Sequence, residues 1–310
     1  MTVRDTVTEE PPFVSTAVRR QSGTEREQVV ETRSTEVRWR SGARELLVVA
    51  LLYAGYSVGR LLADDDLAAA SDRAAEILRV ERLVGLDLEW AWSTWLASHH
   101  VLAVAASYWY SVGHYTVTPA VLLWLWWSRS SAYSKERWTL VLASAIGLVV
   151  YVALPVAPPR LMGYVDVLAT TATAGWWTEH ASAPAGLGHL TNELAAMPSL
   201  HVGWAVWAGL AVWRLSRRPV VRLLAVAHPV VTSVVVVATA NHWLLDVVAG
   251  AMLVLVVDAA VSAWRDRWAR RPEAPEAPED AGTGTTQRPP GAPIHATIGE
   301  GGEHRGSLRC

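Results

Sequence analysis

The 310-residue chain has little cysteine and few charges in its central part. Its one cysteine, Cys310, excludes an internal disulfide framework and a zinc site built on cysteines. Charged residues make up 18% of the chain, against about 25% in soluble domains, and the deficit falls between residues 46 and 264. The net charge of −2 gives no general attraction to nucleic acid.

The central part of the chain is apolar, and the chain as a whole contains 17 tryptophans. These features predict an all-α, polytopic membrane protein, because a transmembrane helix needs about 20 mostly apolar residues. Residues 90–128 contain no charge, but as one helix they would be about twice as long as the hydrocarbon core is thick. We therefore expect an interfacial segment there, Trp90–His100, followed by one span. The six expected spans are Leu46–Leu62, Val101–Trp127, Trp138–Leu154, Ser199–Trp213, Val220–Thr239 and His242–Trp264.

Basic residues in the connections favour six spans over seven. Cytoplasmic loops are enriched in Arg and Lys, and six spans place all four basic clusters on one side, whereas seven would separate them. The intervening loops are acidic. The clusters are Arg38, Arg40 and Arg44; Arg129, Lys135 and Arg137; Arg214, Arg217, Arg218 and Arg222; and Arg265, Arg267, Arg270 and Arg271.

The two ends of the chain differ from its centre. Residues 1–43 are polar, and residues 269–310 are rich in Pro, Gly, Glu and Thr, so both are expected to be disordered cytoplasmic tails. Residues 44–268 are expected to form one membrane domain, located in the cell membrane. Heavy use of Ala, Val and Arg, with a single lysine, suits a GC-rich bacterial genome.

Four ionisable residues occur at the ends of predicted spans, where each is costly to insert. His242 and Asp246 are spaced i,i+4 and so share one helix face. His201 begins another span, and Arg160 follows a third. The predicted topology places all four at one depth on the extracytoplasmic side, which indicates a site built from three helices.

These residue types suit phosphoryl transfer. A histidine beside a carboxylate is held in one tautomer and becomes a better nucleophile, and a second histidine can protonate a leaving oxygen. Arginine binds phosphate oxygens in bidentate fashion, and the helix start at Ser199 offers free amides to an anion. No metal and no other cofactor is required. A metal site of His201, His242 and Asp246 is an alternative, but Arg160 would be an unfavourable neighbour for a cation.

Several other polar residues share the predicted outer side. Tyr110 and His114 in the second span are weaker candidates for substrate contacts, as are His99 and His100. His180, His189 and Asp166 lie in an outer loop and are weaker still. Asp258, about 18 Å below Asp246 along the same helix, has no evident role in the sequence.

Three segments together resemble the type 2 phosphatidic acid phosphatase superfamily. They are Pro158-Pro159-Arg160, the string from Asn192 to His201 that ends in Met-Pro-Ser-Leu-His, and the string from Asn241 to Gly250 with its His-x-x-x-Asp pattern. Within the superfamily they resemble the inositol phosphotransferase and inositol phosphorylceramide synthase branch. The resemblance covers about residues 80–262.

The resemblance implies a role for each motif residue. His242 would be the nucleophile that forms a phosphohistidine, Asp246 would orient it, and His201 would be the general acid. Arg160 and Ser199 would hold the phosphate. Asn241 and Trp243, which flank His242, are further candidates for substrate contacts. Trp243 stands where the transferase branch usually has tyrosine.

Other positions depart from the phosphatase branch. Ala153 and Val236 stand where that branch has cations, Leu161 replaces a proline, and Leu200 replaces a glycine. Fewer cations suit a phosphodiester, with its single negative charge, better than a monoester. The sequence therefore favours a lipid phosphotransferase that moves a phosphoinositol-like head group from a phospholipid to a lipid alcohol. Its expected partners are membrane lipids and no nucleic acid. A lipid phosphatase is the alternative, and a transporter is a third, less favoured, reading.

Overall fold

The computed structural model describes residues 66–178, 181–184 and 192–270, together with isolated positions between 42 and 55. The chain divides into a compact unit, 1–267, and a second unit, 268–310. Most of the first predicted span and nearly all of both predicted tails lie outside the described residues. The elements are α2 (Leu67–Leu83), α3 (Glu89–Ala97), α4 (His100–Ser128), α5 (Ser130–Ala153), η1 (Pro159–Met162), α6 (Val167–Thr170), η2 (Ala172–Ala174), β1 (Trp177–Thr178), β2 (Ala181–Pro184), α7 (Leu200–Leu215), α8 (Pro219–Ala238) and α9 (Leu244–Ala269).

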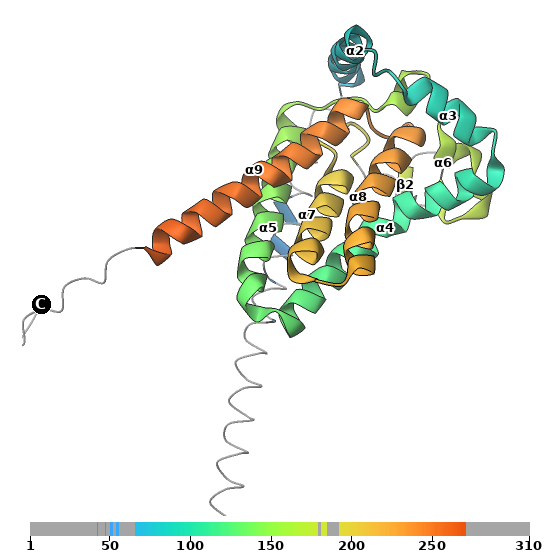
Figure 1. Cartoon of the computed structure of the whole chain (residues 1–310). Helices are drawn as coiled ribbons and strands as arrows, with labels where there is room; N and C mark the ends of the chain where they lie inside the picture. The colour runs from blue at the N-terminus through green and yellow to red at the C-terminus, as the bar shows by residue number, and fades with distance from the viewer. Residues whose placement is uncertain are drawn as a thin grey trace, which may run out of the picture. The chain divides into compact units, whose positions relative to one another are not determined.

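The described part is overwhelmingly helical, which confirms the predicted class (Figure 1). The sequence analysis did not predict the one exception, a two-stranded antiparallel ribbon of β1 and β2. Its six residues lie in the connection between α6 and α7.

Three described helices are long and apolar enough to cross a membrane: Ser131–Ala153, Pro219–Ala238 and Leu244–Ala269. They correspond to the third, fifth and sixth predicted spans. The second and fourth predicted spans form helices α4 and α7, which do not meet the same criterion; α7 has only 16 residues. The Trp-rich segment before α4 forms a separate helix, α3, so residues 90–128 are not one continuous helix.

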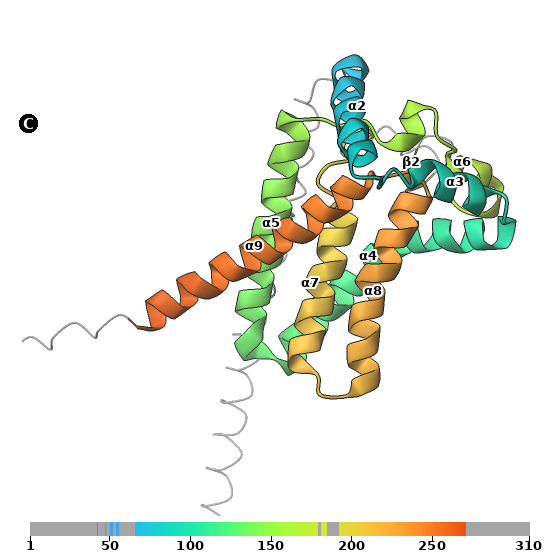
Figure 2. The same cartoon turned by 45° about the horizontal axis from the view of Figure 1, so that its top comes forward.

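Helices α4, α5, α7 and α8 pack side by side (Figure 2). The α4–α5 and α7–α8 connections lie together at one end of this group, and α9 starts at the other end. Leu125 of α4, Trp207 of α7 and Val254 of α9 meet in the largest apolar cluster. The Trp207 indole N–H donates to the Glu136 carbonyl oxygen at 2.9 Å, so even this buried ring has its polar atom satisfied.

Helices α7 and α9 approach each other closely where α7 begins. A Cβ atom on Gly250 would lie 2.1 Å from the Ser199 carbonyl oxygen, and one on Gly203 would lie 3.2 Å from the Gly250 carbonyl oxygen. The Ser199 amide donates to the Asp246 carbonyl oxygen at 2.9 Å. Only glycine at position 250 permits this contact, since the atom it would meet is backbone.

We expect Gly250→Ala to separate the start of α7 from α9 and to destabilise the protein by about 2–4 kcal/mol, a range typical of overpacked cores and lost buried hydrogen bonds. Gly113→Ala is the matched control, because the nearest atom to its added Cβ lies 3.6 Å away, on the Trp109 side chain. That substitution should be neutral or stabilising, as alanine is the better helix former. Thermal unfolding of the purified proteins measures both; equal unfolding temperatures would contradict the close approach.

Asp258, which the sequence left without a role, belongs to an ionic cluster that joins three helices. Its carboxylate binds Arg214 of α7 through two contacts of 2.9 and 2.7 Å, and Lys135 of α5 binds the same carboxylate. Lys135 also contacts Glu136 at 3.2 Å. Two cations therefore balance two carboxylates, and the cluster connects α5, α7 and α9.

We expect Asp258→Ala to destabilise the protein by about 1–3 kcal/mol, since Lys135 and Arg214 would lose their shared partner. The expected loss of stability is smaller than for a fully buried ion pair, because the Arg214 side chain is 41% exposed. Asp266→Ala, at an exposed position of the same helix, is the control and should change the free energy of unfolding by less than about 0.5 kcal/mol. Denaturant unfolding in detergent distinguishes the two, and equal effects would rule out a stabilising cluster.

Candidate active site

His242 lies in the turn between α8 and α9. Ala240 has a positive φ of 58°, which reverses the chain direction after α8. The amides of Asn241 and His242 both donate to the Val236 carbonyl oxygen, at 3.2 and 3.1 Å. These bonds fix the backbone of the turn, and the His242 ring is buried just before the first residue of α9.

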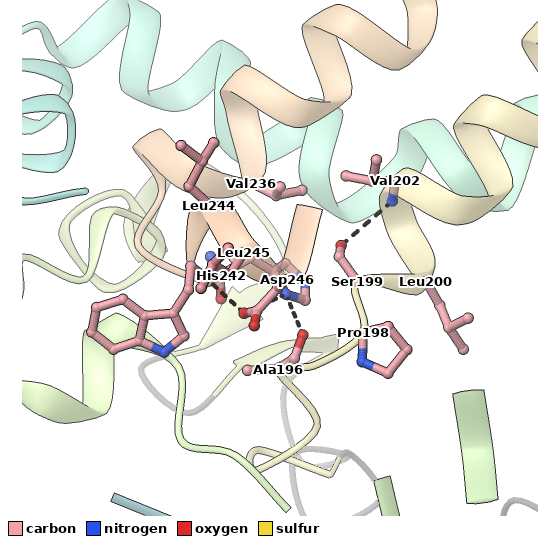
Figure 3. Close-up of polar contacts among 12 residues, drawn as sticks. Ala196, Pro198, Ser199, Leu200, Val202, Val236, His242, Leu244, Leu245 and Asp246 are labelled. Atoms are coloured by element: carbon pink, nitrogen blue, oxygen red, sulfur yellow. Dashed lines mark hydrogen bonds and ion pairs between the residues drawn. The ribbon is translucent and has the colours of Figure 1, made fainter. Parts of the chain in front are cut away.

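The hydrogen-bond partners of the His242 ring define its tautomer (Figure 3). Nδ1 lies 2.8 Å from the Ala196 carbonyl oxygen and 3.5 Å from Asp246 Oδ2. Both neighbours are acceptors, so Nδ1 carries the proton. Nε2 is buried and has no hydrogen-bond partner among the described residues. The unprotonated nitrogen is therefore the one with its lone pair available for chemistry.

Asp246 is fully buried on the first turn of α9. Its Oδ2 accepts the Trp243 amide at 2.8 Å, and its main-chain oxygen accepts the Ser199 amide. Asp246 thus closes the turn that carries His242 and also holds the start of α7 in place.

His201, on the first turn of α7, lies beside His242. The two ring centroids are 5.5 Å apart, with an interplanar angle of 63°. On its other side His201 stacks on Tyr110 of α4, with centroids 4.5 Å apart. The structure thus brings Tyr110, a weaker candidate from the sequence, against His201.

The segment before Arg160 and the segment before His201 run side by side. Val156 pairs with Ala195 in a parallel bridge, and the Val156 amide donates to the Leu194 carbonyl oxygen at 2.8 Å. This pairing aligns the Pro-rich segment before Arg160 with the segment that ends in His201. It also places the Ala196 carbonyl oxygen at His242.

The Arg160 side chain is 7% exposed and is hydrogen-bonded to the turn that carries His242. Its Nε donates to Asn241 Oδ1 at 3.2 Å, and its amide donates to the Ala240 carbonyl oxygen at 2.9 Å. Asp166 and Glu193 each lie 3.9 Å from the guanidinium. Asn241 thus orients Arg160, and Asp166, which precedes α6, lies at the site.

Ser199 and Trp243 occupy structural positions. Ser199 is fully buried, and its Oγ caps α7 by accepting the Val202 amide at 3.4 Å. Trp243 has no exposed surface; its indole N–H donates to the Ala157 carbonyl oxygen at 2.9 Å. The side chains of three further sequence candidates, His114, His180 and His189, lie outside what the structure describes.

Residues 75–260 match the PAP2 superfamily, and this range contains every residue placed at the site above. The chain belongs to the PAP2 superfamily. Membership identifies it as a phosphatase or phosphotransferase. No curated protein and no solved structure matches the chain.

Three residues that support the site, Ala196, Glu81 and Glu89, were not predicted from the sequence. The Ala196 contact is made by a main-chain oxygen, which no residue type signals. Glu81 and Glu89 were treated only as part of an acidic outer loop, yet both are fully buried and bind the first amides of α9. Among the described residues, no group of three or more His, Cys, Asp or Glu side chains is arranged to hold a metal ion.

We expect Asp246→Asn to keep the His242 tautomer, because the Ala196 carbonyl oxygen still accepts from Nδ1. Turnover should fall by about 10²-fold, less than the ~10⁴-fold seen where a lone aspartate sets the tautomer of a catalytic histidine. Nitrogen NMR of the His242 ring reports the tautomer, and Asp166→Asn controls for the loss of a nearby charge. A change of tautomer in Asp246→Asn would contradict the assignment.

Proposed function

We propose that this PAP2 protein is a membrane lipid phosphotransferase that works through a phosphohistidine on His242. The observation that supports it most strongly is the His242 ring itself. Its Nδ1 faces two acceptors, and its Nε2 retains a lone pair beside His201. A buried imidazole held in this way is a nucleophile rather than a passive hydrogen-bond donor.

The reaction has two steps. In the first, His242 Nε2 attacks the phosphorus of a phospholipid; an N–P bond forms, the bond to the lipid oxygen breaks, and His201 donates a proton to that oxygen. In the second, His201 takes the proton from a lipid alcohol, whose oxygen attacks phosphorus and releases His242. Asp246 stabilises the positive charge that the His242 ring carries in between.

The charges around Arg160 favour a phosphodiester substrate. The recorded ion pairs at the site join this one arginine to two carboxylates, Asp166 and Glu193. A phosphomonoester carries up to two negative charges and needs more cationic compensation than this arrangement supplies. A phosphodiester carries one, which suits transfer of a phosphorylated head group such as phosphoinositol to a lipid alcohol.

We infer further that the site faces the extracytoplasmic side. The connections opposite the site contain Arg129, which precedes α5, and Arg217 and Arg218, which precede α8. These arginines follow the rule that cytoplasmic loops are basic. With the first predicted span, both chain ends would then be cytoplasmic.

The test compares the lipids of host cells that express the wild type, His242→Ala or His228→Ala. His228, on α8 next to Trp109, controls for removal of a partly buried imidazole. We expect a new phosphodiester lipid in wild-type and His228→Ala cells and a loss of more than 10³-fold in His242→Ala cells, as for other catalytic nucleophiles.

Loss of a phosphomonoester lipid without a new diester would support the alternative, a lipid phosphatase, in which water accepts the phosphoryl group. Equal product in wild-type and His242→Ala cells would exclude His242 as the nucleophile. Membrane insertion of all three proteins is checked by their extraction into detergent.

A further inference from the structure

The start of α9 has three consecutive amides that each donate to a carboxyl group. The Trp243 amide donates to Asp246 Oδ2 at 2.8 Å, the Leu244 amide to Glu89 Oε1 at 2.9 Å, and the Leu245 amide to Glu81 Oε1 at 2.7 Å. Figure 3 shows Leu244 and Leu245 beside His242 and Asp246. Carboxyl groups at a helix N-terminus are favourable, because its free amides carry partial positive charge.

The two glutamates reach α9 because of how α2 ends. Gly85 adopts a positive φ of 71°, and the amides of Gly85 and Leu86 donate back to Arg82 and Glu81 carbonyl oxygens. This is the Schellman arrangement, in which glycine avoids the steric penalty of the left-handed conformation. The chain turns sharply there, so Glu81 at the end of α2 and Glu89 at the start of α3 face the same helix start.

The two side chains are fully buried and interact with each other. Their remaining oxygens, both Oε2, are buried without a recorded hydrogen bond to another residue of the described chain. Asp246 faces the pair from α9, with His242 behind it, and Tyr164 faces it from the segment after η1. Those neighbours supply no permanent cation, so three adjacent carboxyl groups cannot all be ionised at neutral pH.

Burial is the main cause that raises the pKa of Glu81, to about 8, and it raises the pKa of Glu89 in the same direction. The negative charge of Asp246 adds to both shifts. The two glutamates accept consecutive amides of α9, so their carboxyl groups are neighbours, and the negative charge of Glu89 adds to the rise in the pKa of Glu81. A single proton on Glu81 would leave each glutamate free to accept one amide of α9 through its Oε1.

We propose that Glu81 and Glu89 share one proton at neutral pH and act as a positioning pair for the start of α9, and hence for His242 and Asp246. Its role in catalysis rests on the proposed function, whereas the shared proton does not. Loss of the proton would put a second full negative charge beside Asp246 and push the glutamates apart. The turn that carries His242 would then lose its support.

The pair makes stability depend on pH in a defined direction. The folded-state pKa of Glu81 exceeds its ordinary value of 4.5, so the protonated form favours the folded state. The stabilisation is complete below pH 4.5 and is lost progressively as the pH rises to about 8. Glutamine at position 81 mimics the protonated side chain: its oxygen can accept the Leu245 amide, and its amide can donate to Glu89.

The test uses the full-length protein in detergent and compares wild type, Glu81→Gln and Glu81→Ala. Glu76→Gln is the matched control, since Glu76 lies on the same helix with its side chain 72% exposed. Unfolding temperature is measured from pH 5 to 9. Infrared spectroscopy follows the carbonyl stretch of a protonated carboxyl group over the same range.

We expect the unfolding temperatures of wild type and Glu76→Gln to fall between pH 5 and 8. Both proteins should also show an infrared band of a protonated carboxyl group that titrates near pH 8. Glu81→Gln should lack that band and unfold at a temperature that changes little with pH and is at least as high as that of wild type at pH 8.5. Glu81→Ala should be less stable at every pH, because the Leu245 amide would be left without its acceptor.

If lipid product can be followed, wild-type turnover should fall about tenfold per pH unit above pH 8 relative to Glu81→Gln, as expected for one essential proton. Absence of product in every variant would count against the proposed function alone, since unfolding and the infrared band still report on the pair. The shared proton is refuted if Glu81→Gln keeps the wild-type pH dependence of unfolding or is less stable than wild type at pH 8.5.

Discussion

The first two amides of α9 bind two fully buried carboxyl groups, and a backbone amide shielded from water needs an acceptor. The site depends on this constraint. Three carboxyl groups, from Asp246, Glu89 and Glu81, satisfy three successive amides, and two of the three come from residues more than 150 positions earlier in the chain. The same bonds that complete the helix also fix the backbone that carries His242.

The remaining parts of the site are held to α9 through main-chain atoms. Asp246 accepts the Ser199 amide through its carbonyl oxygen, and the close contact at Gly250 keeps the start of α7 at that distance. Ala196, three residues before Ser199, offers its carbonyl oxygen to His242. Because these contacts use the backbone, the position of His201 relative to His242 is set by the path of the chain rather than by side-chain packing.

The site thus combines side-chain contacts with main-chain contacts, and this difference explains what could be predicted from the sequence. His201, His242, Asp246 and Arg160 stand out because ionisable side chains are rare in apolar helices, and their motifs gave the superfamily that the match confirms. The three apolar helices α5, α8 and α9 were predicted from the length of their apolar runs. Trp243 was predicted as a substrate contact because it flanks His242, and Ser199 as a phosphate contact because it begins a helix. In the structure their side-chain polar atoms bind Ala157 and Val202.

The contribution of Glu81 and Glu89 could not be read from the sequence in the same way. Eight acidic residues lie between positions 64 and 89, and most acidic residues in an outer loop are solvated. Gly85 is the local signal, since a glycine after a helix marks a sharp turn. It indicates where α2 ends, but the partner amides lie in α9, and pairing over such a separation follows only from the tertiary fold.

Helix α9 carries two buried acids, Asp246 and Asp258, about 18 Å apart, and the two differ in the charge of their partners. Asp258 is neutralised by two cationic side chains, Arg214 and Lys135, so its charge is fully engaged in holding α5, α7 and α9 together. The Asp246 carboxylate has the Trp243 amide and the His242 ring as neighbours, and no Arg or Lys of the described residues forms an ion pair with it. Its charge is therefore available to the His242 ring. In the apolar setting of a membrane helix, this difference in partners makes the N-terminal end of α9 suited to chemistry and its C-terminal half suited to anchoring.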